Sequence, residues 1–478
     1  MDVFKKLIIS LVILVLLSLF FLIFTYTVKL NSAEITSQEL SILEYLHVFT
    51  ATNTDERLAQ FRAAGNKNAW VHLAQLHAHK SPNTAFQLGE YFLSRNNKRS
   101  AVIWFKTAIR QKHSEARLAL ANIYFESQQY LAIKPLLLPI ITNDNALALL
   151  YKLALHQGDL NFIDKYKSQL AKATDADFYR ELVHYSVFND TLEEKKIGTR
   201  SSSSSATCLF EVQLFATNLA GLRHAVALIS SFEQHRLSEY ICLAPPKYIP
   251  SKTINCQNEI SKHINCNARV WLTRKDVSSR YIGLIVEQGA ANVDNGIMYL
   301  DQHDTIDVLV HELSHFIGFL DEYPLSKQHQ VCQKAQETPF AHNLVILDKN
   351  YQGNRKALRE HILSQVPWRD LIKDSTPILS QGKNGWQLAT PREFNDQVGV
   401  FEADTCFYSS HVQAFKPIAR RTKLEYFELT FPEIYERIFL LAPRQYLMPS
   451  YHYNISQDLV EQGELSDAIE VLQTTLFD

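Results

Sequence analysis

The pattern of apolar and polar positions divides the chain into three stretches, beginning with a continuous apolar run. Residues 7–26 carry only apolar and hydroxyl side chains and follow Lys5 and Lys6. About 20 such residues suffice for a helix to cross a membrane. The run therefore predicts a transmembrane signal anchor over residues 7–28, with residues 1–6 as a cytoplasmic tail and the bulk of the chain outside the cytoplasm.

A cleaved signal peptide is the alternative to this anchor. Such a peptide has a shorter apolar core and ends at a site of small residues, of which Asn31-Ser32-Ala33 is a poor version. The pattern favours the anchor. We therefore expect a single-pass membrane protein, held in the membrane through residues 7–28, whose bulk would be periplasmic in a Gram-negative bacterium.

The second stretch, residues 45–195, has the apolar spacing of helices and a recurring unit of roughly 30–32 residues. The first helix of the unit occurs at residues 85–92 and again at 118–125, and a second apolar helix follows each of these segments. A further copy starts at Ala146. Small residues with aromatic neighbours at these positions resemble tetratricopeptide or Sel1-like repeats, which implies a surface that binds a protein or peptide partner. A plain helical bundle is the alternative.

The third stretch begins after a polar segment. The five serines 201–205 indicate a linker over residues 196–206. Beyond it, residues 207–450 carry strand-like runs at 209–215, 268–273, 281–286 and 292–300, and residues 454–478 predict a helical pair. The last strand-like run is either an edge strand that pairs with an extended substrate or an ordinary internal strand. Together the stretches predict an α+β protein with a transmembrane helix, an all-α repeat-like domain and a mixed domain.

Composition narrows the possible classes of function. The chain of 478 residues has 48 basic and 50 acidic side chains, a net charge of −2, which gives no sign of nucleic-acid binding. All six cysteines lie between Cys208 and Cys406. An even number confined to one domain outside the cytoplasm predicts disulfides, although the sequence does not choose among the pairings. Free buried thiols are the alternative.

The candidate chemistry lies in residues 311–321, which read HExxHxxGxxD. His311 and His315 share one face of a helix, so both can bind one metal ion. Glu312 lies beside them, where its carboxylate can take a proton from a metal-bound water. Gly318 allows the turn that brings Asp321 back as the third ligand. The alternative is a core helix with two buried histidines, because residues 306–320 are largely apolar.

This motif resembles the metzincin zinc peptidases, and Asp321-Glu322-Tyr323 resembles their igalysin branch, the IgA-peptidase-like enzymes. Residues 366–372, 376–378 and 398–403 follow in a similar order, so the resemblance covers about residues 280–440. It implies a metzincin-like fold for residues 207–450, one Zn²⁺ ion and peptide-bond hydrolysis. Glu322 is a reserve ligand, since the spacing to the third ligand varies in the family.

The resemblance also implies a tight turn with a methionine beneath the metal. Residues 422–426 match that turn in shape but have Leu424 at the methionine position, while Met448 follows the next helix rather than preceding it. We favour Leu424, because leucine has a similar volume. Tyr426 would then stabilise the oxyanion, and the alternative is that it is a half-buried aromatic residue.

The sequence thus predicts a membrane-anchored zinc metalloendopeptidase acting on a peptide or protein substrate. Zinc held by His311, His315 and Asp321 would lower the pKa of its water, and Glu312 would act as general base, with Tyr426 as a second catalytic residue. The rival hypothesis is an inactive peptidase fold that serves as a scaffold, with the helical repeats binding protein partners. Substrate, specificity and oligomeric state stay open.

Overall fold

The computed structural model describes residues 12–21, 24, 54–188 and 208–473, except positions 64, 174–175, 258, 260–261, 275–276 and 384. The predicted linker, residues 196–206, lies outside the described residues. The chain divides into two compact units. Unit 1 contains the residues up to Leu153 together with Lys172–Asp175, and unit 2 contains Ala154–Ala171 and Ala176–Asp478.

The predicted transmembrane anchor is wrong. Of residues 7–28, the structure describes a helical stretch over 12–21 and residue 24. Within the described chain, helices with enough length and apolar character to cross a bilayer are absent. This corrects the expected single-pass membrane location as well.

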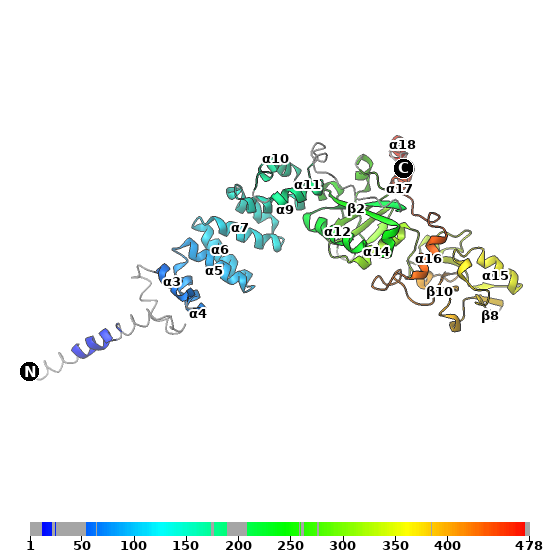
Figure 1. The fold of residues 1–478 in the computed structure, drawn as a ribbon, viewed down its shortest axis with the longest axis horizontal. Helices are drawn as coiled ribbons and strands as arrows, with labels where there is room; N and C mark the ends of the chain where they lie inside the picture. The colour runs from blue at the N-terminus through cyan, green and yellow to red at the C-terminus, as the bar shows by residue number, and fades with distance from the viewer. Residues whose placement is uncertain are drawn as a thin grey trace, which may run out of the picture. The chain divides into compact units, whose positions relative to one another are not determined.

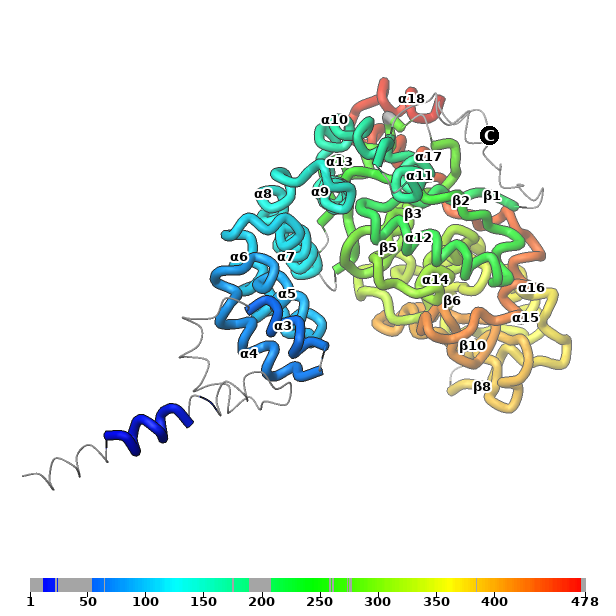
Figure 2. Tube along the Cα trace, turned by 60° about the vertical axis from the view of Figure 1, so that its left-hand side comes forward, coloured from blue at the N-terminus to red at the C-terminus, as the bar shows by residue number. Residues whose placement is uncertain are grey.

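Unit 1 consists of short helices joined by tight turns, and Figure 2 shows them stacked in chain order. A sharply repeated capping pattern sets their length. The side chains of Ser81, Asn97 and His113 accept a hydrogen bond from a backbone N–H of the helix that each precedes. These caps stand 16 positions apart, so a helix pair recurs every 32 positions. The helices are α3 (Thr54–Ala63), α4 (Lys67–His77), α5 (Pro82–Ser94), α6 (Lys98–Arg110), α7 (Ser114–Glu126), α8 (Ile133–Leu137) and the first part of α9 (Asp144–Gln157).

Close packing of α5 on α6 follows from one glycine. A Cβ atom on Gly89 would lie 2.4 Å from the Phe105 ring. The Phe105 side chain is therefore fully buried against the backbone of α5. This contact belongs to one apolar core that runs through unit 1 from Leu58 to Ile123.

Unit 2 is built on a sheet of strand order β2-β1-β3-β5-β4. All neighbours are parallel except β4, which runs antiparallel to β5. The strands are β1 (Phe210–Ala216), β2 (Ile241–Tyr248), β3 (Tyr281–Val286), β4 (Asn292–Asp294) and β5 (Ile297–Asp301). Strand β3 is buried along its whole length because helices cover both faces of the sheet.

The two faces carry different helices. On one face, Ile282, Leu284 and Val286 share a core with α17 (Tyr451–Glu461) and α18 (Leu465–Gln473). On the other, a Cβ atom on Gly221 of α12 (Leu219–Phe232) would lie 3.5 Å from Ile285. Helix α14 (Ile306–Phe316) contacts α12, β4 and β5, and Figure 1 shows α12 and α14 beside the sheet.

Two of the strand-like runs differ from expectation. Residues 268–273 are not a strand but the 3-10 helix Ala268–Thr273, capped by the Asn267 side chain, and Trp271 packs against the Phe215 ring. Residues 292–300 form the hairpin of β4 and β5, because Asn295 and Gly296 both have positive φ and make a two-residue turn. Strand β4 is the edge of the sheet and β5 is internal.

The rest of unit 2 contains two small antiparallel sheets. Their orders are β10-β11-β6 and β7-β9-β8. The strands are β6 (Val345–Asp348), β7 (Asn350–Tyr351), β8 (Leu379–Gly382), β9 (Gly385–Leu388), β10 (Phe401–Ala403) and β11 (Val412–Lys416). The remaining helices are α10 (Leu160–Leu170), α11 (Ala176–His184), α13 (Ser251–Ile254), α15 (Arg355–Leu363) and α16 (Glu433–Leu441). Mixed helix and sheet agrees with the α+β class.

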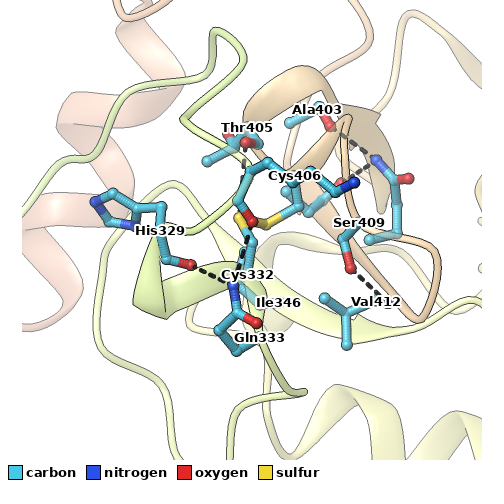
Figure 3. Close-up of a disulfide and its surroundings, with 12 residues drawn as sticks. His329, Cys332, Gln333, Ile346, Ala403, Thr405, Cys406, Ser409 and Val412 are labelled. Atoms are coloured by element: carbon cyan, nitrogen blue, oxygen red, sulfur yellow. Dashed lines mark hydrogen bonds between the residues drawn. A yellow bond between two sulfur atoms is a disulfide. The ribbon is translucent and has the colours of Figure 1, made fainter.

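The prediction of disulfides is confirmed. The six cysteines form the pairs Cys208–Cys242, Cys256–Cys266 and Cys332–Cys406, all in unit 2. The third pair closes a loop across 74 positions and joins the segment after α14 to the segment before β11. Figure 3 shows this disulfide beside Thr405.

Candidate metal centre

Helix α14 presents two histidines whose ring orientation is fixed by backbone carbonyls. The Nδ1 atom of His311 lies 2.9 Å from the Lys423 carbonyl oxygen, and Nδ1 of His315 lies 3.0 Å from that of Phe319. A carbonyl oxygen can only accept, so each Nδ1 carries a proton, and in the neutral form of each ring Nε2 keeps its lone pair. This is the tautomer in which imidazole binds a metal through Nε2.

The chain leaves α14 through a turn that needs glycine. The backbone N–H groups of Gly318 and Phe319 donate to the carbonyls of His315 and Ser314, a Schellman end with Gly318 at φ +84°. A Cβ atom here would lie 2.3 Å from the Tyr446 carbonyl oxygen. The predicted role of Gly318 therefore has two physical reasons, the positive φ and the close approach of Tyr446.

Asp321 returns to the histidines as the motif predicts. Its Oδ1 atom lies 3.2 Å from His311 Nε2 and 3.5 Å from His315 Nε2. This oxygen is buried, and no described residue donates a hydrogen bond to it. One ligand atom from each of the three residues falls within 4.8 Å of the others, so the group can hold a metal ion. An unpartnered oxygen that faces two imidazole lone pairs fits a bound cation.

Asp321 is a carboxylate at neutral pH. Burial alone would raise its pKa, but the neighbouring His315 and His311 and the Tyr323 hydroxyl lower the pKa below its ordinary value. The charge that a cation requires is therefore present before the cation arrives.

Glu312 lies beside the ligands without being one of them. Its side chain is buried, and its Oε2 atom is 3.9 Å from His315 Nε2. Burial raises the pKa of this carboxyl to about 7, against the opposing influence of the two histidines. A carboxyl group with such a pKa can accept and return a proton near neutral pH.

The reserve ligand Glu322 has a different environment. Its side chain is completely buried and its two oxygens accept hydrogen bonds from four donors. These are Asn343 Nδ2 at 2.9 Å, Lys416 Nζ at 2.9 Å, Thr422 Oγ1 at 2.7 Å and the Tyr435 hydroxyl. Both Glu322 oxygens therefore already have donors. Through these donors Glu322 connects the segment that carries Asp321 to β11, to α16 and to the turn at 422–426.

That turn lies against the metal ligands. The Lys423 carbonyl bonds to His311, the Leu424 carbonyl accepts from the Glu322 N–H at 2.9 Å, and the Leu424 side chain is fully buried. The Lys423 ammonium reaches back to Asp307 in the first turn of α14 at 2.7 Å. Met448 contacts the other end of the same helix, where its N–H donates to the Phe316 carbonyl.

Of the two tyrosines near the site, the one singled out from the sequence is not the one that touches a ligand. Tyr426 is 45% exposed, and its ring packs under the Arg421 guanidinium at 4.8 Å. Tyr323 instead donates a hydrogen bond from its hydroxyl to Asp321 Oδ2 at 2.8 Å. The sequence signal was its place two residues after Asp321, close enough in the chain for the hydroxyl to reach the carboxylate.

Comparisons with known proteins give no match, whether against family models, curated proteins or solved structures. The metal group therefore stands on the geometry of this chain alone.

Proposed function

We propose that unit 2 is a zinc-dependent peptidase of the metzincin kind, with His311, His315 and Asp321 as metal ligands and Glu312 as general base. The observation that carries this proposal is Asp321 Oδ1, which is buried, unpartnered among the described residues and directed at two imidazole Nε2 atoms. Two histidines and a carboxylate are a ligand set that suits Zn²⁺ and leaves a coordination position open.

Different groups in the site would carry out different parts of the hydrolysis. A cation in this group would supply Lewis acidity that polarises the substrate carbonyl and makes a water more acidic. Glu312, buried beside the two histidines, takes the proton from the attacking water and passes it to the leaving amine. The backbone carbonyls of Lys423 and Phe319 hold the two histidines in place during both transfers.

The edge strand β4 offers a place for the substrate. It pairs with β5 on one side and packs against α14, the helix that carries the metal ligands. An extended peptide can add to such an edge through main-chain hydrogen bonds, which would bring a peptide bond past the metal group. The proposed substrate is therefore an unfolded or extended peptide segment.

Unit 1 and the disulfides bear on the binding partner and the cellular compartment of the proposed peptidase. We propose that the helical repeats bind a protein partner or the substrate itself, since stacked helix pairs expose extended binding surfaces. Three disulfides are typical of proteins that work in an oxidising compartment.

The proposal is tested with the purified full chain loaded with Zn²⁺ and a mixed peptide library. Wild-type protein should cleave peptides, and Glu312→Ala should keep its metal while turnover falls roughly 10²–10⁴-fold, the usual contribution of a positioned general base. Glu337→Ala, which removes an exposed carboxylate paired with Lys334, is the matched control and should leave turnover unchanged. Wild-type protein that holds one zinc ion and cleaves nothing would favour the scaffold.

A further inference from the structure

The two oxygens of the Asp321 carboxylate have different surroundings. Oδ1 faces the Nε2 atoms of His311 and His315, whereas Oδ2 accepts the hydrogen bond from the Tyr323 hydroxyl at 2.8 Å. A carboxylate near a cation can bind through one oxygen or through both. A donor on Oδ2 selects binding through one oxygen, because it fixes the rotation of the carboxylate and occupies the second oxygen.

Tyr323 can do this only if its own backbone is held in place, and it is held on both sides. The preceding residue, Glu322, is fixed by four buried donors. Two residues further on, the Leu325 N–H donates to the Thr405 carbonyl at 3.0 Å. Tyr323 therefore sits on a segment whose two ends are anchored.

Thr405 links the same segment to the third disulfide. Its hydroxyl donates to the Asp321 carbonyl oxygen at 2.8 Å, and the next residue, Cys406, is bonded to Cys332. Figure 3 shows Thr405 next to this disulfide. The backbone of Asp321 is thus clamped by Thr405 and its side chain by Tyr323, and the two contacts act on different atoms.

We propose that Tyr323 is a positioning residue that fixes Asp321 as a one-oxygen metal ligand, and that Tyr426 has no such role. The inference rests on the proposed metal centre but not on peptidase activity. Removing the partner of a metal ligand usually weakens metal binding by about 10–100-fold. Since the Tyr323 side chain is 38% exposed, loss of its hydroxyl should leave the packing of unit 2 unchanged.

The test compares Tyr323→Phe with Tyr426→Phe in the full chain. Three quantities are measured: the dissociation constant for Zn²⁺ by chelator competition, the visible absorption of the Co²⁺-loaded protein, and the melting temperature without metal. Tyr323→Phe should weaken Zn²⁺ binding about 10–100-fold and shift the Co²⁺ bands, with an unchanged melting temperature. Tyr426→Phe should match wild type in all three.

Two results would overturn the inference. One is Zn²⁺ affinity within a factor of about two of wild type and an unchanged Co²⁺ spectrum in Tyr323→Phe. The other is a loss of affinity that comes with an equal loss of stability without metal, since that indicates a structural role. None of the three measurements requires hydrolysis. A wild-type protein that binds metal but cleaves nothing would therefore contradict the peptidase proposal and leave this inference unaffected.

Discussion

Asp321 and Glu322 are neighbours in the chain, one with a single buried carboxylate oxygen and the other with a fully buried side chain, and their surroundings are opposite. Asp321 has a buried oxygen with no donor among the described residues, next to two imidazole lone pairs. Both oxygens of Glu322 are bonded, by four donors that include the Lys416 ammonium. A folded chain leaves a buried charge unsatisfied where a ligand completes it, and satisfies it fully where the charge holds the structure. The comparison therefore favours Asp321 as the proposed metal ligand and Glu322 as the residue that holds the surrounding structure in place.

The largest expected difference between the two residues is in the free energy of unfolding without metal. Glu322→Ala leaves Lys416 buried with a single weaker partner, Glu425 at 3.4 Å, and should lower the free energy of unfolding by about 3–5 kcal/mol. Asp321→Ala removes one unsatisfied oxygen and one that accepts only from the Tyr323 hydroxyl, so it should lower that free energy much less than Glu322→Ala does. Denaturant titration of both proteins after chelation measures the difference. Equal losses in the two variants would break the contrast.

The Cys332–Cys406 disulfide should come next in size. It closes a loop across 74 positions, for which chain entropy gives about 4 kcal/mol of stabilisation. Because Thr405 holds the Asp321 carbonyl, the double variant Cys332→Ser, Cys406→Ser should also bind Zn²⁺ more weakly. The matched control is Cys256→Ser with Cys266→Ser, whose loop spans 10 positions. Unfolding curves and chelator competition should show that the control loses less stability and no metal affinity.

A smaller effect is a dependence of stability on pH from His342. This side chain is buried next to the Phe319, Phe439 and Tyr446 rings, and burial lowers its pKa to about 4 from an ordinary value of 6.5. The unfolded chain therefore binds a proton between pH 6.5 and pH 4 that the folded chain does not. The stabilisation is full above pH 6.5 and is lost as pH falls toward 4, by about 3 kcal/mol in all.

The matched variant for that measurement is His342→Leu, which keeps the site apolar and removes the titrating group. Its unfolding free energy should fall less between pH 7 and pH 4 than that of wild type, both measured without metal. Parallel curves for the two proteins would show that His342 does not cause the acid sensitivity.

The contrast between the two carboxylates also shows what the sequence could and could not predict. His311, Glu312, His315, Gly318 and Asp321 lie within eleven positions, so helix geometry and the glycine turn were enough to assemble them. The role of Glu322 was not predictable, because its donors come from positions 343, 416, 422 and 435, and only the fold brings them together.

Secondary structure follows the same division between local and distant causes. The Asn295-Gly296 turn carries a local hairpin signal that divides residues 292–300 into β4 and β5. The apolar run at residues 268–273 is compatible with both a strand and a helix. The Asn267 cap and the packing of Trp271 on Phe215 stabilise the 3-10 helix. The predicted membrane helix was wrong, since helices long and apolar enough to cross a bilayer are absent from the part of the chain that the structure describes.

The most direct test of the central claim is the zinc content of three purified proteins after reconstitution and dialysis. Native mass spectrometry should find one Zn²⁺ ion in wild type, one in Glu322→Gln and none in Asp321→Ala. Glu322→Gln is chosen because it keeps the size of the buried side chain and one of its two accepting oxygens. Zinc retained by Asp321→Ala but lost from Glu322→Gln would contradict the assignment of ligand and support, and with it the proposed metal centre.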